Sequence, residues 1–64
     1  MPLTRLIVEL HKEEIYTYLI DGIFSFKKFD SVSKIVTLSV DELYDYMYYL
    51  SLDEFITLIK NRLA

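Results

Sequence analysis

Few residues in this sequence could support catalysis. One histidine, His11, stands among the carboxylates Glu9, Glu13 and Glu14. A histidine beside carboxylates is a local pattern of metal sites and of acid–base pairs. No motif places a nucleophile beside His11, and the chain holds neither a cysteine nor a second histidine to complete a ligand set. Charged turns of this kind are usually solvated, so we predict no metal and no catalytic residue here.

Two pairs of adjacent carboxylates, Asp41-Glu42 and Asp53-Glu54, are the other candidates for acid–base chemistry. Each pair lies in a Ser-x-x-Glu segment, the pattern of a helix capping box, in which serine and glutamate satisfy each other's backbone amides. Capping explains both pairs with one mechanism. The single glycine leaves no glycine-rich phosphate loop. We therefore predict a protein that is not an enzyme and binds no cofactor.

The two capping boxes also predict where two C-terminal helices begin, over residues 40–49 and 52–63, within a helical segment 39–64. The alternative is one long helix with Ser51 in its interior, and the two cap signals favour the break. Apolar residues at three- and four-residue intervals give each helix one face to bury. These faces comprise Val40, Leu43, Met47 and Leu50 in the first helix, and Leu52, Phe55, Ile56, Ile59 and Leu63 in the second.

The first part of the chain is typical of β-strands. In residues 5–10, Leu6, Val8 and Leu10 alternate with Arg5, Ile7 and Glu9, which is the two-residue period of a strand. Residues 15–20 are rich in β-branched and aromatic types. Asp21-Gly22 is a strong hairpin signal, because a type I′ turn needs positive φ at both central residues. We predict an antiparallel β-meander over residues 4–38 with strands 5–10, 15–20 and 23–28. Residues 35–38 form either a fourth strand or an extended entry to the helices.

These elements predict one α+β domain, residues 1–64, with the helical pair on one face of the meander. Turns centred on Lys12-Glu13 and Asp21-Gly22 sort the strands into two faces. The face expected to meet the helices carries Leu6, Val8, Leu10, Ile15, Thr17, Leu19, Phe24 and Phe26. The other face carries Arg5, Ile7, Glu9, Tyr16, Tyr18, Ile20, Ile23 and Ser25.

The second face predicts an interaction surface, because two short helices cannot cover both sides of a sheet. Large exposed apolar patches mark contact sites, and tyrosine is enriched in them. A C2 homodimer is the commonest way to bury such a face, and a foreign protein partner is the alternative. The expected interface residues are Ile7, Tyr16, Tyr18, Ile20 and Ile23 from the sheet, and Tyr44 and Tyr48 from the first C-terminal helix.

Composition narrows the classes of function. With 64 residues, 53% apolar side chains and no cysteine, the chain must fold on a dense core or with a partner subunit. A net charge of −3 disfavours nonspecific binding of nucleic acid. Neither a signal peptide nor a membrane-length apolar run is present, so we expect a cytoplasmic protein that does not bind membranes. Its size, and its scarcity of Gly, Pro, Ala and Cys, suggest an accessory protein of a virus, phage or mobile element, acting in the host cytoplasm.

Three hypotheses for function follow. The first is a non-catalytic protein-interaction module, such as an inhibitor, adaptor or accessory factor. The second is a small nucleic-acid-binding transcriptional regulator, in which tyrosines stack on bases and Arg5, Lys27, Lys28 and Lys34 contact phosphates. The third is an acidic mimic of DNA, which a net charge of −3 supports only weakly. We favour the first.

Overall fold

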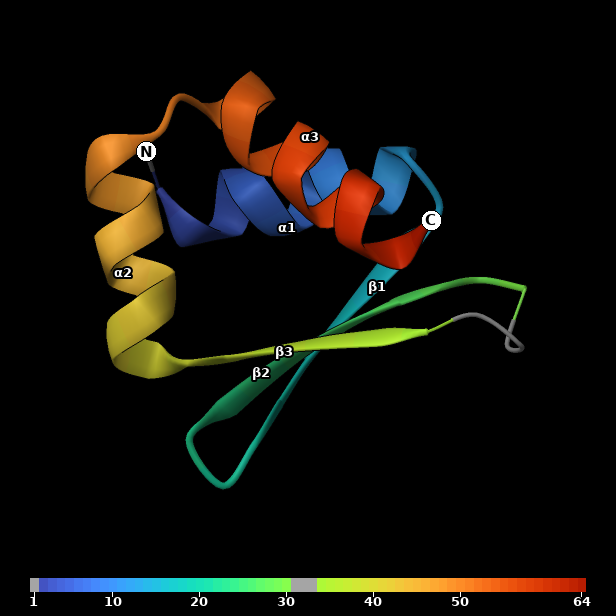
Figure 1. Cartoon of the computed structure of the whole chain (residues 1–64), viewed down its shortest axis with the longest axis horizontal. Coiled ribbons are helices and arrows are strands. Elements are labelled where there is room, and N and C mark those ends of the chain that lie inside the picture. Colours follow the sequence, from blue (N-terminus) through green and yellow to red (C-terminus); the bar gives the residue numbers. More distant parts are fainter. Residues whose placement is uncertain (1, 31–33) are drawn as a thin grey trace.

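The protein has an α+β fold, as the sequence predicts. The computed structural model describes residues 2–30 and 34–64. Three helices lie together on one side of an antiparallel sheet with strand order β1-β2-β3 (Figure 1). In chain order the elements are α1 (Leu3–Lys12), β1 (Ile15–Ile20), β2 (Ile23–Lys28), β3 (Ile35–Ser39), α2 (Val40–Tyr49) and α3 (Leu52–Leu63).

The predicted first strand is wrong, because residues 5–10 belong to α1. Leu3, Leu6 and Leu10 recur at the spacing of one helix face, and Leu6 and Leu10 are fully buried. Val8, which a strand would turn to the same side as those leucines, is instead 52% exposed. The predicted turn at Lys12-Glu13 is wrong for the same reason. A two-residue link joins the helix to β1 and contains Glu14 with a φ of 61°.

The predicted hairpin of β1 and β2 is confirmed residue by residue. Asp21 and Gly22 adopt φ angles of 52° and 75°, as a type I′ turn requires. Ile20 pairs with Ile23, and the expected pairs of Leu19 with Phe24 and Thr17 with Phe26 also form. The turn therefore sets the register of this hairpin, and with it the side of the sheet on which each side chain lies.

Residues 35–39 form a strand, β3, which pairs antiparallel with β2. Of the two possibilities left open by the sequence, the strand is thus the observed one. Because 5–10 is helical, this strand is the third of the meander and not a fourth. Its buried residues, Val36 and Leu38, lie opposite Phe26 and Phe24 and extend the apolar face of the hairpin.

The two C-terminal helices begin and end where the capping boxes predict. Ser39 and Ser51 are the N-caps, and each makes both hydrogen bonds of the box with Glu42 or Glu54. The helices are separate, since Leu50 leaves the helical region with a ψ of 149°. The acidic first turns and the basic residues of the last turn of α3 suit the helix dipole.

One apolar core lies between the sheet and the three helices. Helix α1 packs on β1 and α3, while α2 and α3 pack on β2 and β3. In the predicted core face, Val8 and Leu19 are wrong, since both are more than half exposed. The buried core comprises Leu6, Leu10, Ile15, Phe24, Phe26, Val36, Leu38, Leu43, Phe55, Ile59 and Leu63.

Candidate functional site

The side of the sheet that faces away from the helices carries no covering element among the described residues. Strand alternation and the observed register place three rows of side chains there. Tyr16, Lys27 and Ile35 form one row, while Tyr18, Ser25 and Thr37 form the next. Ile20 and Ile23 lie beside the hairpin turn. We call these eight residues the open face.

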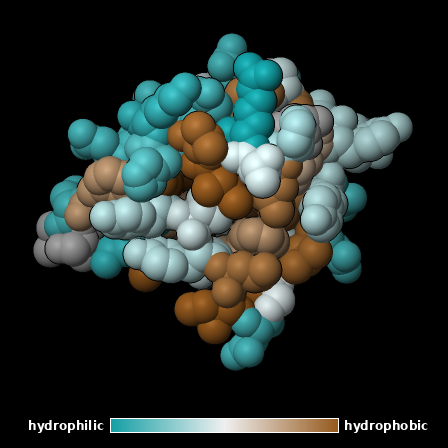
Figure 2. Space-filling model, turned by 180° about the vertical axis from the view of Figure 1, so that it is seen from behind, coloured by the Kyte–Doolittle hydropathy of each residue, from teal (hydrophilic) through white to brown (hydrophobic). Residues whose placement is uncertain are grey.

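The open face is apolar and exposed. Ile20 and Ile35 are 65% and 58% exposed, and Tyr18 is 46% exposed. Seen from behind, one group of hydrophobic residues lies at the lower end of the molecule, where the hairpin of β1 and β2 turns (Figure 2). Contiguous exposed apolar surface of this kind is typical of contact sites in small proteins.

A groove of about 280 Å³ crosses the open face, lined by Tyr18, Ile20, Ser25, Lys27 and Ile35. Lys27 is its only charged residue, and none of the eight open-face residues is acidic. The ion pairs found among the described residues do not involve Lys27. The open face thus carries positive charge on a chain whose net charge is −3.

An aromatic group borders the open face at the start of β1. The rings of Tyr16 and Phe29 stack with centroids 4.1 Å apart, and Tyr18 lies 6.0 Å from Tyr16. His11, at the end of α1, meets Phe29 edge-on at 5.0 Å. The turn predicted at His11 is wrong, because the residue lies in the last turn of α1, where it is exposed and also close to these rings. The stacking favours this orientation of the Tyr16 ring.

The structure brings four of the predicted interface residues together and separates the other three. Tyr16, Tyr18, Ile20 and Ile23 all lie on the open face. Ile7 does not, because it is part of α1, where it is half-buried. Tyr44 and Tyr48 are 53% and 82% exposed but project from α2, which lies on the helical side of the sheet.

Four of the eight open-face residues were missing from the predicted interface: Ser25, Lys27, Ile35 and Thr37. Ile35 was omitted because residues 35–38 were read as a strand only provisionally. The alternation of exposed Ile35 with buried Val36 is the signal that could have found it. Lys27 was predicted only as a phosphate contact. The register of the hairpin pairs it with Tyr16 and so places it on the open face, which could have been read from the sequence.

The four predicted nucleic-acid contacts do not all lie on one face of the sheet. Of these four basic residues, only Lys27 lies on the open face. Arg5 is on α1, and Lys28 alternates to the other side of β2. The Lys34 ammonium donates to the backbone oxygen of Ala64 at 3.1 Å.

The glutamates of the capping boxes are occupied with structural hydrogen bonds. The N–H of Ser39 donates to Glu42 Oε1 at 3.1 Å, and the N–H of Ser51 donates to Glu54 Oε1 at 2.9 Å. These amide bonds, followed by the interactions with the serine side chains, hold the pKa of each glutamate below its ordinary value of 4.5. A lowered pKa suits a cap and not a proton donor near neutral pH.

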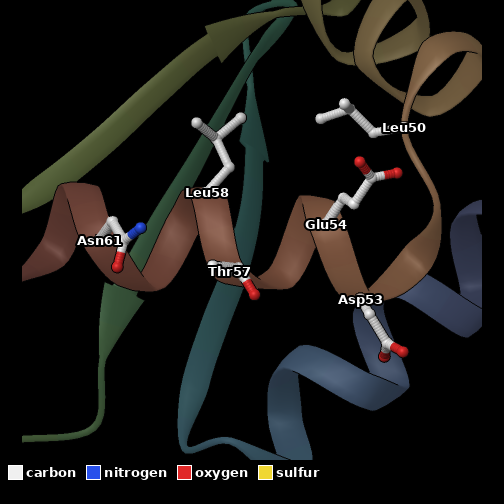
Figure 3. Close-up of a pocket in the computed structure, with 6 residues that line it drawn as sticks. All are labelled: Leu50, Asp53, Glu54, Thr57, Leu58 and Asn61. Atoms are coloured by element: carbon white, nitrogen blue, oxygen red, sulfur yellow. The ribbon is translucent and has the colours of Figure 1, made fainter.

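Another hollow lies along α3, not on the open face. It has a volume of about 470 Å³, and Figure 3 shows that its lining side chains project from α3 and the loop before it. Because every lining residue comes from this one segment, the hollow has no opposing wall to enclose a ligand. Its lining comprises Leu50, Asp53, Glu54, Thr57, Leu58 and Asn61.

A third hollow, of about 350 Å³, lies between the link that joins α1 to β1, the end of β2 and α3. Its charged side chains partly neutralise one another, with Lys60 Nζ 2.8 Å from Glu13 Oε1. Across residues 2–30 and 34–64, no group of three or more His, Asp or Glu side chains is placed to hold a metal ion. None of the described helices is both long and apolar enough to cross a membrane.

The open face is therefore the surface with the most distinctive chemistry. It is apolar, aromatic, free of carboxylates and marked by one lysine. Comparisons with models of known protein families, with curated proteins and with solved structures found no significant match.

Proposed function

We propose that this chain is a non-catalytic protein-interaction module, an inhibitor, adaptor or accessory factor, that binds another protein through the open face. The observation that supports this proposal is the group of exposed side chains, Tyr18, Ile20 and Ile35, around one groove. Tyrosine is enriched among the few residues that supply most of the binding energy of protein interfaces. An accessory role for a virus or phage in its host's cytoplasm is part of the same proposal.

The charge of the open face indicates what kind of protein it binds. Lys27 needs a carboxylate opposite it when the groove is covered, because an unpaired buried ammonium is strongly unfavourable. A second copy that met this face with its own open face would bring no acidic residue. The partner is therefore a different protein. It offers apolar side chains to the tyrosines and isoleucines of the open face, and an Asp or Glu placed to pair with Lys27.

Affinity capture from the native host tests this proposal with three baits. The wild-type chain and Tyr48→Lys should capture the same protein, because Tyr48 lies on α2, away from the open face. Tyr18→Lys should reduce the captured amount at least tenfold, since it places a charge in the groove. Because Tyr18 is 46% exposed, this variant should keep the circular dichroism spectrum of the wild type.

Charge reversal at Lys27 makes the test specific to the open face. Lys27→Glu should weaken binding of the captured protein. Replacing the Asp or Glu of that protein that pairs with Lys27 by lysine should restore the binding. A captured protein that binds Tyr18→Lys as well as the wild type, and is lost with Tyr48→Lys, would place the contact on α2 and refute the proposal.

A second function, binding of single-stranded nucleic acid, is favoured by one observation. The stacked Tyr16 and Phe29, with Tyr18 beside them and Lys27 across the row, resemble the aromatic platforms on which bases stack. Gel shifts with single-stranded oligonucleotides across a range of salt concentrations test this alternative. Retardation at low salt that disappears in Tyr18→Lys would support it, and no retardation at low salt would exclude it.

A further inference from the structure

The first strand, β1, is an edge of the sheet with unused backbone groups. A two-residue turn makes Ile20 and Ile23 a hydrogen-bonded pair, so every second residue of β1 bonds to β2. The N–H of Phe29, which donates to the oxygen of Glu14 at 3.0 Å, continues this alternation. The backbone groups of the intervening residues therefore point away from the sheet, and no backbone partner for them is found in the described part of the chain. These residues are Ile15, Thr17 and Leu19.

The β1 edge lacks the features that normally prevent strands from pairing. Exposed edges usually carry a lysine, a proline, a bulge or an inward-pointing charge. β1 has none of these over its six residues, all of which are apolar except Thr17 and the two tyrosine hydroxyls. The other edge, β3, is shorter and runs directly into the capping box at Ser39.

Two side chains on β1 do not match their surroundings in the described part of the chain. Thr17 Oγ1 is buried and, in the described residues, has no hydrogen-bond partner. Leu19 alternates to the helical side of the sheet, yet it is 58% exposed. Both lie at positions whose backbone groups point to the free edge. The unpaired hydroxyl and the exposed leucine thus lie on the strand whose edge is unprotected.

We propose that two copies of this chain pair through β1, antiparallel, about a two-fold axis at Thr17. In this register Thr17 faces Thr17 of the second copy. Ile15 of each copy faces Leu19 of the other. Each of these pairs is of the hydrogen-bonded type, which exchanges two backbone bonds. The contact is isologous, so it closes after two copies instead of growing into a fibre.

The proposed pairing supplies partners for both side chains. Opposed threonines commonly hydrogen-bond across antiparallel strands, and a rotation of χ1 between staggered positions directs the hydroxyl toward its counterpart. Leu19 gains Ile15 of the second copy as its cross-strand neighbour. The same register sets Tyr16 opposite Tyr18 of the second copy, so the two open faces join into one surface.

This inference goes beyond the proposed function, because it concerns the sheet edge and not the open face. Self-association and capture of a foreign protein depend on different residues and are measured separately. If the chain remains monomeric, the open face can still bind its partner. If no partner is found, the edge contact is still tested by the oligomeric state.

Disulfide trapping tests the register directly, since the wild-type chain has no cysteine. In the proposed dimer the two Thr17 Cα atoms lie about 5.5 Å apart, within the range that a disulfide spans. Thr17→Cys should therefore give a covalent dimer on mild oxidation, seen on a non-reducing gel. Its matched control is Tyr18→Cys. In the proposed register residue 18 faces residue 16 of the second copy, so the two Cα atoms of residue 18 are two residues apart along the strands, more than about 7 Å, and a disulfide cannot join them.

The outcomes separate edge pairing from other dimers. Cross-linking of Thr17→Cys and not of Tyr18→Cys supports the proposal. Cross-linking of Tyr18→Cys alone would show that the open faces meet, and would overturn it. Light scattering of the wild type at micromolar to millimolar concentration should give twice the mass of one chain, and a monomer throughout this range would also overturn it.

A substitution at the edge tests the contact without a new bond. Leu19→Lys places a charge beside the pairing strand, where natural edges carry lysine, and should raise the dimer dissociation constant at least tenfold. Tyr48→Lys is the control, since α2 makes no contact with β1, and should leave the constant unchanged. Equal effects of the two substitutions would contradict edge pairing. Circular dichroism of both variants checks that they remain folded.

Discussion

At the scale of single residues, Thr17 is the clearest conflict between side-chain chemistry and environment. Its hydroxyl is buried on the helical side of β1, and no partner for it is found in the described residues. A buried hydroxyl without a partner costs about 1–3 kcal/mol of stability. Removing this hydroxyl while keeping the shape of the side chain should therefore not destabilise the single chain.

We predict that Thr17→Val stabilises the monomer. Valine has nearly the same shape, has high β-propensity and removes the unsatisfied hydroxyl, so the free energy of unfolding should rise by about 1 kcal/mol. Urea denaturation at low protein concentration measures this change. Thr37→Val is the control, because Thr37 is exposed to water on the same sheet, and its effect should stay within about 0.5 kcal/mol. A destabilised Thr17→Val would show that the hydroxyl is satisfied in the monomer.

At the scale of elements, local signals predicted some segments and failed for one. The hairpin and the two C-terminal helices were predictable because each is specified by short-range chemistry. Asp21-Gly22 adopts the positive φ angles of its turn, and Ser39 and Ser51 form complete capping boxes. Such signals act over a few residues and do not depend on the rest of the fold.

Helix α1 was missed because two periodicities overlap in its sequence. Leu6, Val8 and Leu10 alternate as in a strand, while Leu3, Leu6 and Leu10 fit a helix. Pro2 precedes the helix without a side-chain cap, so no start signal favoured the second interpretation. Packing against β1 and α3 decides the outcome. Ile7 was misplaced in the candidate site for this reason, whereas the residues of the hairpin were placed correctly.

The capping boxes give a prediction about acid stability. Folding lowers the pKa of Glu42 and Glu54 below 4.5, so their contribution is complete above pH 4.5 and is lost as pH falls through the lowered value. Replacing both with glutamine keeps a hydrogen-bond acceptor and removes the titration. The double variant should therefore lose less stability than the wild type between pH 6 and pH 3, measured by urea midpoints.

A glutamate outside the capping boxes provides the control for this experiment. Glu14→Gln changes a side chain for which no hydrogen bond is found among the described residues, and it should keep the pH dependence of the wild type. If the double glutamine variant also follows the wild-type curve, the capping boxes do not contribute to acid sensitivity.

At the scale of the whole molecule, the single chain is already as compact as a folded monomer of its mass. Its accessible surface is 4327 Å², and surface scaling gives about 4,300 Å². Helices cover one face of the sheet, and the buried residues form one cluster. A single chain thus buries one apolar core, and the open face and the β1 edge lie outside it.

A core this small makes the whole fold depend on each large buried side chain. Total stability for 64 residues is about 3–10 kcal/mol, while Phe→Ala in a core costs about 3–5 kcal/mol. Phe55 is fully buried and meets Tyr46 edge-on at 5.7 Å. We therefore expect Phe55→Ala to be largely unfolded at 37 °C by circular dichroism. Tyr48→Ala, at an 82% exposed site, should shift stability by less than about 0.5 kcal/mol. A Phe55→Ala variant that melts like the wild type would mean that the helical layer does not depend on this core.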